Sequence, residues 1–437
     1  GSVPRALNYS DVMEAGTPSG VFQIVTNLPN NGGTFAPQST VNFALNVPVN
    51  SFVDMSRAYL KFSIENTGST NKLMLDKSAG AASIIDSIKI LSPTGQIISE
   101  QQHYNALTAM IADYTGPGHV DGFLNVAEGT TSSPLGEIPV GLSTGTDTIG
   151  NRVEIAKSTT ASFCHVPHGG LWNCDRYLPL GFVNGQLQIQ IQLASNEAGV
   201  LADKTKTSTW QSLGWELHLP IVRTPEDFNV NLRQLMASGV NLNIHMKDWA
   251  NQQATIGSGA VGDTNVLLAN RKRSVDAVFA MFRTAGQLSN QLEETACARR
   301  TCGTIGYQFT VAGVDMPSKR VVGSATDIGE YMVNTQMAFG KLGYATSSSI
   351  ATRTNYYLAE DTTKGSLVVY ALDMQAYKGV ISGMNLSSAM PLIFKPTLGG
   401  NADSNATKLG AVVCDVFSHF DSVLTLSGPT GALSVSN

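Results

Sequence analysis

The segment Gln186–Leu193 alternates polar and apolar residues without interruption. Successive side chains of a β-strand point to opposite faces of a sheet, so this pattern predicts a strand with one buried face. Residues 41–47 and 60–64 alternate in the same way. Turn-forming sequences, such as Ser92–Gly95 and Ser427–Gly431, lie between strand-like segments. Many short strands joined by polar turns favour β-sandwiches or barrels over alternating strand–helix units.

Two helices are predicted among these strands. The first follows Ser99, which forms a capping-box pattern with Gln102, and the second starts at Asp327, with Glu330 in the equivalent position. Apolar residues at helical spacing give each predicted helix one apolar face. These residues are Tyr104, Leu107, Met110, Ile111 and Tyr114 in the first helix, and Ile328, Tyr331, Met332, Phe339 and Leu342 in the second.

The two predicted helices have matching contexts. Ser87–Leu91, a Pro-Thr-Gly turn and Gln96–Ile98 precede the first, whereas Gly306–Val311, an Ala-Gly turn and Val314–Pro317 precede the second. The two helix starts are separated by about half of the chain. This arrangement indicates one strand–turn–strand–helix unit used twice, in two β domains of about 200 residues each.

Composition excludes several classes of protein. Only 14% of the 437 residues are charged, against about 25% in an average soluble domain. Hydrophobic residues make up 42%, which argues against a disordered chain, and no apolar run reaches the roughly 18 residues of a membrane-spanning helix. The net charge is −5 and Arg5 is the only basic residue among the first fifty. A nucleic-acid packaging arm is therefore not expected.

The five cysteines do not form the even, regularly spaced set of a disulfide framework. Free thiols in a reducing compartment are the simpler interpretation. Residues 1–4 lack the charged start and apolar core of a signal peptide, so none is expected.

Several motifs match chemical signatures only in form. Gly257–Gly262 fits a dinucleotide-binding pattern, but no helix pattern follows it, so we interpret it as a loop. Gly141–Gly145 fits the nucleophile elbow, but it lies in a Gly/Ser/Thr-rich segment with no helix pattern after it. Arg271–Arg273 is interpreted as a solvent-exposed segment at the start of a strand. The four tryptophans are expected to be core or interface anchors; they are Trp172, Trp210, Trp215 and Trp249.

Two groups of residues carry potential metal ligands or redox-active thiols. Cys164, His165, His168 and Cys174 lie close in sequence, but their spacing is irregular for a structural zinc site, so metal binding is the minority interpretation. Cys297 and Cys302 could pair if oxidised, although two free thiols near a strand start are the simpler interpretation.

At this point the sequence resembles the double jelly-roll major capsid proteins of the adenovirus, virophage and membrane-containing-phage lineage of icosahedral DNA viruses. The resemblance covers most of the chain in order. It is carried by Ile84–Tyr114, Asp175–Leu180, Ile305–Pro317 with Glu330-Tyr331, Ile381–Ser388 and Asp415–Leu426.

The resemblance implies an all-β chain with minor helices, built as two tandem jelly-roll β-sandwiches. We expect an N-terminal extension over 1–34, a first jelly roll over 35–223 and a linker with a second jelly roll over 224–437. The strand with Trp215, Leu217 and Leu219 runs into the boundary, near Pro220–Asp227. Residues 115–162 are expected to form an insertion loop on the exterior.

The implied function is that of a major capsid protein, whose pseudo-hexagonal homotrimers tile an icosahedral shell. The expected partners are the chain itself, neighbouring trimers, minor capsid or penton proteins, and an underlying membrane in viruses that have one. No direct sequence-specific nucleic-acid binding is expected. The expected location is the virion, after assembly inside the host cell. We expect no enzyme activity, no catalytic, cofactor-binding or metal-binding residue, and no cofactor.

Two alternatives remain open at this stage. One is a single-jelly-roll coat protein with a projecting domain, against which the repeated unit and the missing basic arm count. The other is a secreted carbohydrate-active or adhesive β-sandwich protein, which the apparent lack of a signal peptide disfavours.

Overall fold

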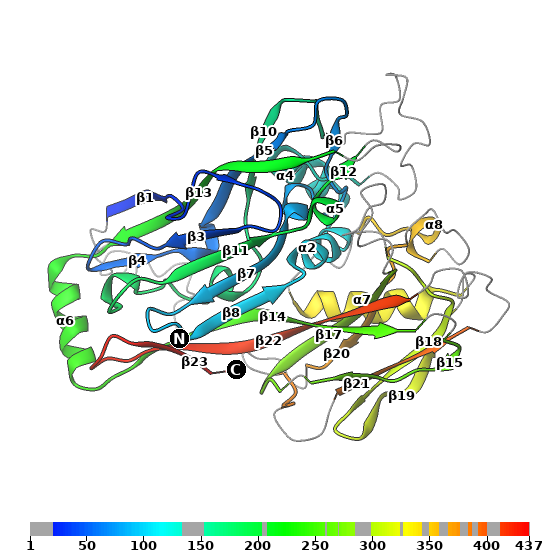
Figure 1. Cartoon of the computed structure of the whole chain (residues 1–437). Coiled ribbons are helices and arrows are strands. Elements are labelled where there is room, and N and C mark those ends of the chain that lie inside the picture. The colour runs from blue at the N-terminus through cyan, green and yellow to red at the C-terminus, as the bar shows by residue number, and fades with distance from the viewer. Residues whose placement is uncertain are drawn as a thin grey trace, which may run out of the picture.

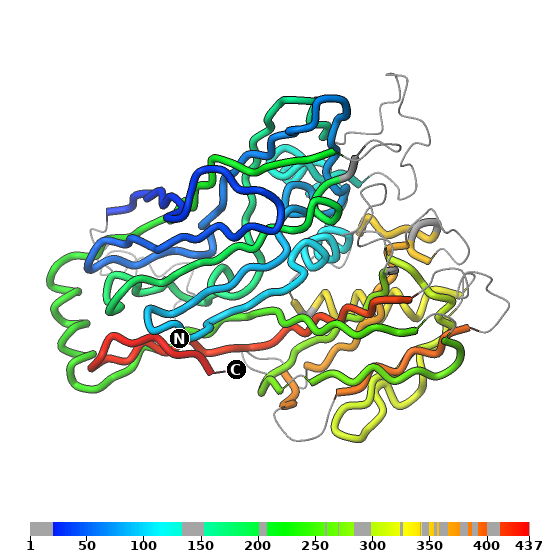
Figure 2. The backbone as a smooth tube through the Cα atoms, in the orientation of Figure 1, coloured from blue at the N-terminus to red at the C-terminus, as the bar shows by residue number. Residues whose placement is uncertain are grey.

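The computed structural model has two β-sandwich halves that lie against each other (Figure 1). It describes residues 21–132, 153–202, 208–257, 260–269, 271–284, 299–323, 327–342, 349–357, 366–375, 383–386, 392–399 and 411–436. The tube in Figure 2 shows the blue-to-green first half beside the green-to-red second half, with the long red and green strands of the second half running along the first. One hydrophobic core contains residues of both halves.

The first half holds two main sheets and a small one. One main sheet has the order β1-β13-β5-β10, with β2 and β4 also on β13; the other has the order β3-β11-β7-β8, and the small sheet is β12-β6-β9. The strands are β1 (Val21–Asn27), β2 (Thr34–Phe35), β3 (Thr40–Ala44), β4 (Ser51–Val53), β5 (Tyr59–Asn66), β6 (Leu73–Met74), β7 (Ile85–Leu91), β8 (Ile97–Gln102), β9 (Glu154–Ile155), β10 (Thr160–His165), β11 (Gln188–Leu193), β12 (Leu201–Ala202) and β13 (Trp210–Arg223).

The second half holds two sheets. One has the order β14-β22-β17-β20, with β23 on β22, and the other has the order β15-β21-β18-β19, with β16 on β21. The strands are β14 (Leu242–Ile256), β15 (Gly262–Asp263), β16 (Val266–Leu268), β17 (Val275–Thr284), β18 (Thr304–Val311), β19 (Val314–Val322), β20 (Tyr370–Asp373), β21 (Leu392–Leu398), β22 (Val412–Leu426) and β23 (Leu433–Ser436).

The same topology is used twice. In each half a long late strand, β13 or β22, lies between the first long strand and a middle strand, and all of its pairings are antiparallel. In each half the second sheet ends in a hairpin, β7-β8 or β18-β19, and the next long helix follows it. The predicted repeat of a strand–turn–strand–helix unit is therefore confirmed.

The alternating segments form strands with one buried face, as predicted. In β11, Ile189, Ile191 and Leu193 are buried and the residues between them are more exposed. The predicted tryptophan anchors also lie in the core, because all four are at most 6% exposed. Trp215, for example, stacks on Phe62 with ring centroids 4.3 Å apart.

The helices lie between and beside the sheets. They are α2 (Tyr104–Asp113), α3 (Pro117–His119), α4 (Asn125–Glu128), α5 (Asn196–Gly199), α6 (Glu226–Ala237), α7 (Gly329–Lys341) and α8 (Arg353–Tyr356). Short 3-10 turns are η2 (Met55–Arg57), η3 (Ala81–Ile84), η6 (Gly170–Asn173) and η7 (Leu180–Phe182), and η4 (Val120–Leu124) is a π-helical turn. No helix of the described ranges is long and apolar enough to cross a membrane.

The predicted capping boxes are wrong, although both helices exist. Ser99 lies within strand β8, and α2 begins after His103, whose side chain does not cap the helix. Helix α7 begins at Gly329, two residues after the predicted start, with Ile328 as its N-cap. Strand β8 continues to Gln102, so Ser99 lies inside a paired strand. It therefore cannot cap the helix that follows.

The predicted insertion over 115–162 contains structure in its described parts. Helices α3 and α4 and the turn η4 follow α2, and β9 and the start of β10 complete the segment. Residues 133–152 lie outside the described ranges. That this insertion faces the exterior stays a prediction.

The shared core generates a first test. Phe279 of β17 is fully buried and its ring lies 5.7 Å from Trp249 and 4.4 Å from Phe339. We expect Phe279→Ala to lower the free energy of unfolding by about 3–5 kcal/mol. Val333→Ala is the control, because Val333 is 55% exposed and should change stability by less than about 0.5 kcal/mol. Denaturant titration measures both, and equal small effects would contradict the packing described.

Candidate functional site: the junction between the two halves

The end of helix α2 inserts into the second half through a buried ion pair. Asp113 Oδ2 lies 2.7 Å from Arg299 Nη1, and both side chains are 0% exposed. Ser78 donates a hydrogen bond to the other carboxylate oxygen of Asp113, at 2.6 Å. Arg299 also donates to the carbonyl of Leu367, at 3.2 Å. Neither charge reaches water, so each depends on the other half of the chain for its neutralisation.

Backbone and aromatic contacts surround this ion pair. The carbonyl of Asp113 accepts hydrogen bonds from the amide of Ile350 at 3.2 Å and from the hydroxyl of Ser349 at 2.9 Å. The next residue, Tyr114, stacks on Phe339 of α7 with centroids 4.6 Å apart and donates its hydroxyl to the Leu367 carbonyl. The end of α2 is therefore held by α7 and by two loop segments of the second half.

A second contact joins strand β8 to strand β14. Gln101 donates its amide to Asp248 Oδ1 at 2.8 Å, and that oxygen also accepts the backbone amide of Trp249 at 2.8 Å. Burial raises the pKa of Asp248, although its hydrogen bonds, including one from Ser99, act in the opposite direction. Ser99, the predicted helix cap, thus helps to bind a carboxylate of the other half.

A glycine permits the close approach at this contact. Gly169 has φ +73°, and a Cβ there would lie 2.8 Å from Cδ1 of Trp249. Both the backbone conformation and the lack of space therefore disfavour a larger residue.

Strand β14 also makes backbone contacts with the first half. Met246 forms an isolated β-bridge with Cys174, and the amide of Asp175 donates to the carbonyl of His245.

A charged cluster lies within the sheet that faces the junction. Asp276 Oδ2 lies 2.8 Å from Lys247 Nζ and 3.2 Å from His419 Nδ1, and Asp421 Oδ1 lies 2.8 Å from His245 Nε2. Burial raises the pKa of Asp276, but hydrogen bonds from His419 and Lys247 outweigh it, so the pKa is lowered. Burial lowers the pKa of His419.

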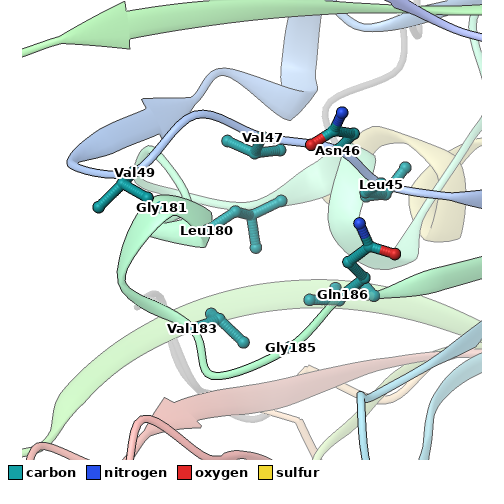
Figure 3. A pocket seen from close by; sticks show the side chains of 10 residues that line it. Leu45, Asn46, Val47, Val49, Leu180, Gly181, Val183, Gly185 and Gln186 are labelled. Atoms are coloured by element: carbon teal, nitrogen blue, oxygen red, sulfur yellow. The ribbon is translucent and has the colours of Figure 1, made fainter.

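Two cavities of the described residues differ in their linings. A cavity of about 310 Å³ lies between the halves, but two of its charged side chains are already paired: Arg283 with Asp415 at 2.7 Å, and His103 with Asp86 at 3.6 Å. A smaller cavity of about 100 Å³ lies in the first half, and Figure 3 shows the apolar side chains that line most of it. The polar side chains in its lining are the amides of Asn46 and Gln186.

The structure keeps His165 and His168 together, with ring centroids 6.0 Å apart, but it does not bring the Cys/His group into a ligand set. Cys164 and His165 are neighbours in β10, so they point to opposite faces of the sheet. His165 is fully buried and lies between Tyr104, at 2.7 Å, and Glu128, at 3.0 Å. Burial and the charge of His165 lower the pKa of His168 to about 4. Burial raises the pKa of Cys174 to about 12, which disfavours the thiolate that a metal requires.

The other motifs also lack the context of a site. Gly257 directly follows strand β14 and Gly262 starts strand β15, so in the described part of this motif a strand follows. Gly141–Gly145 and Cys297 lie outside the described residues, and Cys302 is a buried free thiol. Lys272 lies over the ring of Phe420, 4.3 Å from its centroid. Within the described ranges, no three His, Cys, Asp or Glu side chains are placed to hold a metal ion.

Comparison with solved structures identifies the fold of the chain. No protein-family model and no curated protein match the sequence. Among solved structures, the VP54 protein of PBCV-1, fitted into a reconstruction of the virophage Sputnik, has a TM-score of 0.61 at 10% identity, covering 96% of this chain and 97% of that chain.

Two further structures are similar over nearly their whole lengths. The Faustovirus major capsid protein has a TM-score of 0.56 at 12% identity, covering 93% of this chain and 90% of that chain. The mavirus major capsid protein has a TM-score of 0.53 at 12% identity, covering 100% and 95%. The chain therefore has the double jelly-roll fold, and the fold class predicted from the sequence is confirmed.

The ion pair at the junction generates a second test. Asp113→Asn leaves the buried Arg299 cation without its counter-charge, which we expect to cost about 3–5 kcal/mol of unfolding free energy. The double variant Asp113→Leu/Arg299→Met should be less destabilised than either single variant. Asp263→Asn is the control, because its partner Arg320 is 33% exposed and Asp263 is 59% exposed; the expected loss is below about 1 kcal/mol. Equal losses in Asp113→Asn and Asp263→Asn would overturn the assignment.

The lowered pKa of His419 leads to a prediction about how the unfolding free energy depends on pH. Unfolded histidine titrates near 6.5, whereas folded His419 binds its proton only at lower pH. Below pH 6.5 the unfolded state therefore binds more protons, and the unfolding free energy should fall by up to about 1.4 kcal/mol per pH unit. His419→Gln should flatten this dependence between pH 6.5 and 5, measured by urea titration at several pH values. A wild-type slope in His419→Gln would argue against a role for His419.

Proposed function

We propose that this chain is the major capsid protein of an icosahedral virus and is located in the virion. The observation that carries the proposal is the two-sandwich architecture, which resembles solved viral major capsid proteins over 93–100% of this chain. The repeated topology supports two jelly rolls that divide near residue 224, and the pairing of β1 (Val21–Asn27) with β13 assigns residues before 35 to the first of them. It also argues against a single jelly roll with a projecting domain.

The assembly we propose is a homotrimer. Three copies of a double sandwich supply six jelly rolls, which is enough for a block of pseudo-hexagonal outline that can tile a shell. The low charge of the chain favours lateral packing, because identical neighbours repel each other less. Neighbouring trimers, minor capsid or penton proteins and, where present, an inner membrane complete the proposed set of partners.

We further propose that the role is structural and not enzymatic. The titratable side chains at the junction are buried and paired, so they support rigidity better than catalysis. A secreted glycan-binding protein is the competing function, and glycan-array screening of the purified protein tests it directly.

Native mass measurement tests the proposed assembly. Light scattering at neutral pH should give a species of three times the 46.3 kDa subunit mass, and electron micrographs of the same fraction should show hexagonal outlines. Assembly into closed shells under crowding would extend the result. A monomer that persists at every concentration and binds glycans would contradict the capsid proposal.

A further inference from the structure

Exposed apolar side chains gather at one end of the first half. Phe22 and Ile24 of β1 are 51% and 54% exposed, Tyr177 is 50% exposed and Phe228 of α6 is 48% exposed. Figure 1 places β1, β4 and α6 together at this end. A contiguous apolar surface of this kind marks an interaction site more often than chance exposure does.

The strand register joins these residues into one surface, which we call the end face. Val222 of β13 pairs with Phe22 on one side and with Phe52 on the other. Residues opposite each other in antiparallel strands share one face of the sheet. The Phe52 ring then meets the ring of Phe228, with centroids 6.0 Å apart. The end face therefore runs without a break from β1 across the sheet to α6.

A groove in the end face could hold an apolar segment. Its volume is about 470 Å³, and its lining includes Phe52, Tyr177, Phe228, Leu232 and Ile244. Arg57 connects it to β1, because the guanidinium lies 5.1 Å from the centre of the Phe22 ring and interacts with Tyr177.

The chain itself carries a segment positioned to reach this groove. Residues 1–20 join β1 at Val21, which pairs with Arg223 close to the start of α6. The groove begins two strands away from β1, about 10 Å at the usual strand spacing, whereas a fully extended segment of this length can span up to about 70 Å. The segment has apolar residues to bury, namely Val3, Leu7, Tyr9, Val12 and Met13.

We propose that residues 1–20 bind in the groove of the end face of their own chain. The covalent connection favours this occupant, because a tethered segment has a high effective concentration at a nearby surface. Binding would cover Phe228 and Tyr177, whose aromatic rings are otherwise half exposed to water. The proposal goes beyond the capsid role and does not depend on it.

Hydrogen exchange of the full-length protein tests the proposal. Amides within residues 3–13 should exchange roughly tenfold or more slowly than in the free peptide of the same sequence. Phe228→Ser and, separately, Leu7→Ser should each remove most of this protection. Val333→Ser is the matched control, because Val333 is also about half exposed but lies on α7, and it should leave the protection unchanged.

Each other outcome contradicts the proposal in a distinct way. Free-peptide exchange rates in the wild-type segment would show that it does not bind. Protection that survives Phe228→Ser would place the segment elsewhere. Protection that appears only at high protein concentration, or only in assembled particles, would show that the segment binds a second copy instead. Leu7→Ser changes only the segment, so loss of folding at the groove cannot imitate the expected result.

Discussion

The ion pair between Asp113 and Arg299 sets the relation of the two sandwiches. Removing two charges from water costs several kcal/mol for each ion, and only a well-placed partner with additional hydrogen bonds offsets that cost. Here the partners belong to different halves, and Ser78 and the Leu367 carbonyl supply the additional bonds. A shift of one half against the other would leave both charges buried and unpaired. The junction therefore strongly favours one arrangement of the two sandwiches.

The repeated unit has different surroundings in its two copies. Helix α2 follows the hairpin β7-β8 and is buried along its whole length, because it lies at the junction. Helix α7 follows the equivalent hairpin β18-β19, yet it keeps an exposed side with Val333 and Met337. The helix of the repeated unit is thus fully buried at the junction in one half and partly exposed at the surface in the other. The end of each helix contacts the opposite half, because Phe339 of α7 stacks on Tyr114, but the buried ion pair comes from Asp113 at the end of α2.

Sequence periodicity predicted the strands and the duplication well, because each depends on local alternation such as that of Ile189 and Ile191. The helix starts were less predictable, since the pairing of Ser99 in β8 is a long-range contact that overrides its local capping preference. The junction could not be predicted. Asp113 and Arg299 are far apart in sequence, and no local pattern around either residue points to the other. Such pairs become visible only when the topology brings two halves together. Conversely, Cys164 and His165 are neighbours in the sequence but point to opposite faces of their sheet. Their proximity in sequence therefore did not indicate a shared site.

The distribution of charge connects the interior to the surface. Charged residues are scarce in this chain, yet several of them are buried, where they join strands and halves: Asp113, Glu128, Asp248, Asp276, Arg283, Arg299, Asp415 and Asp421. Every charge placed in the core is one fewer on the outside, so the surface is even less charged than the composition indicates. A weakly charged exterior lowers repulsion between identical copies and leaves contacts to polar and apolar side chains. The buried charges favour a single arrangement of the halves, and their absence from the surface makes close packing of many copies less costly.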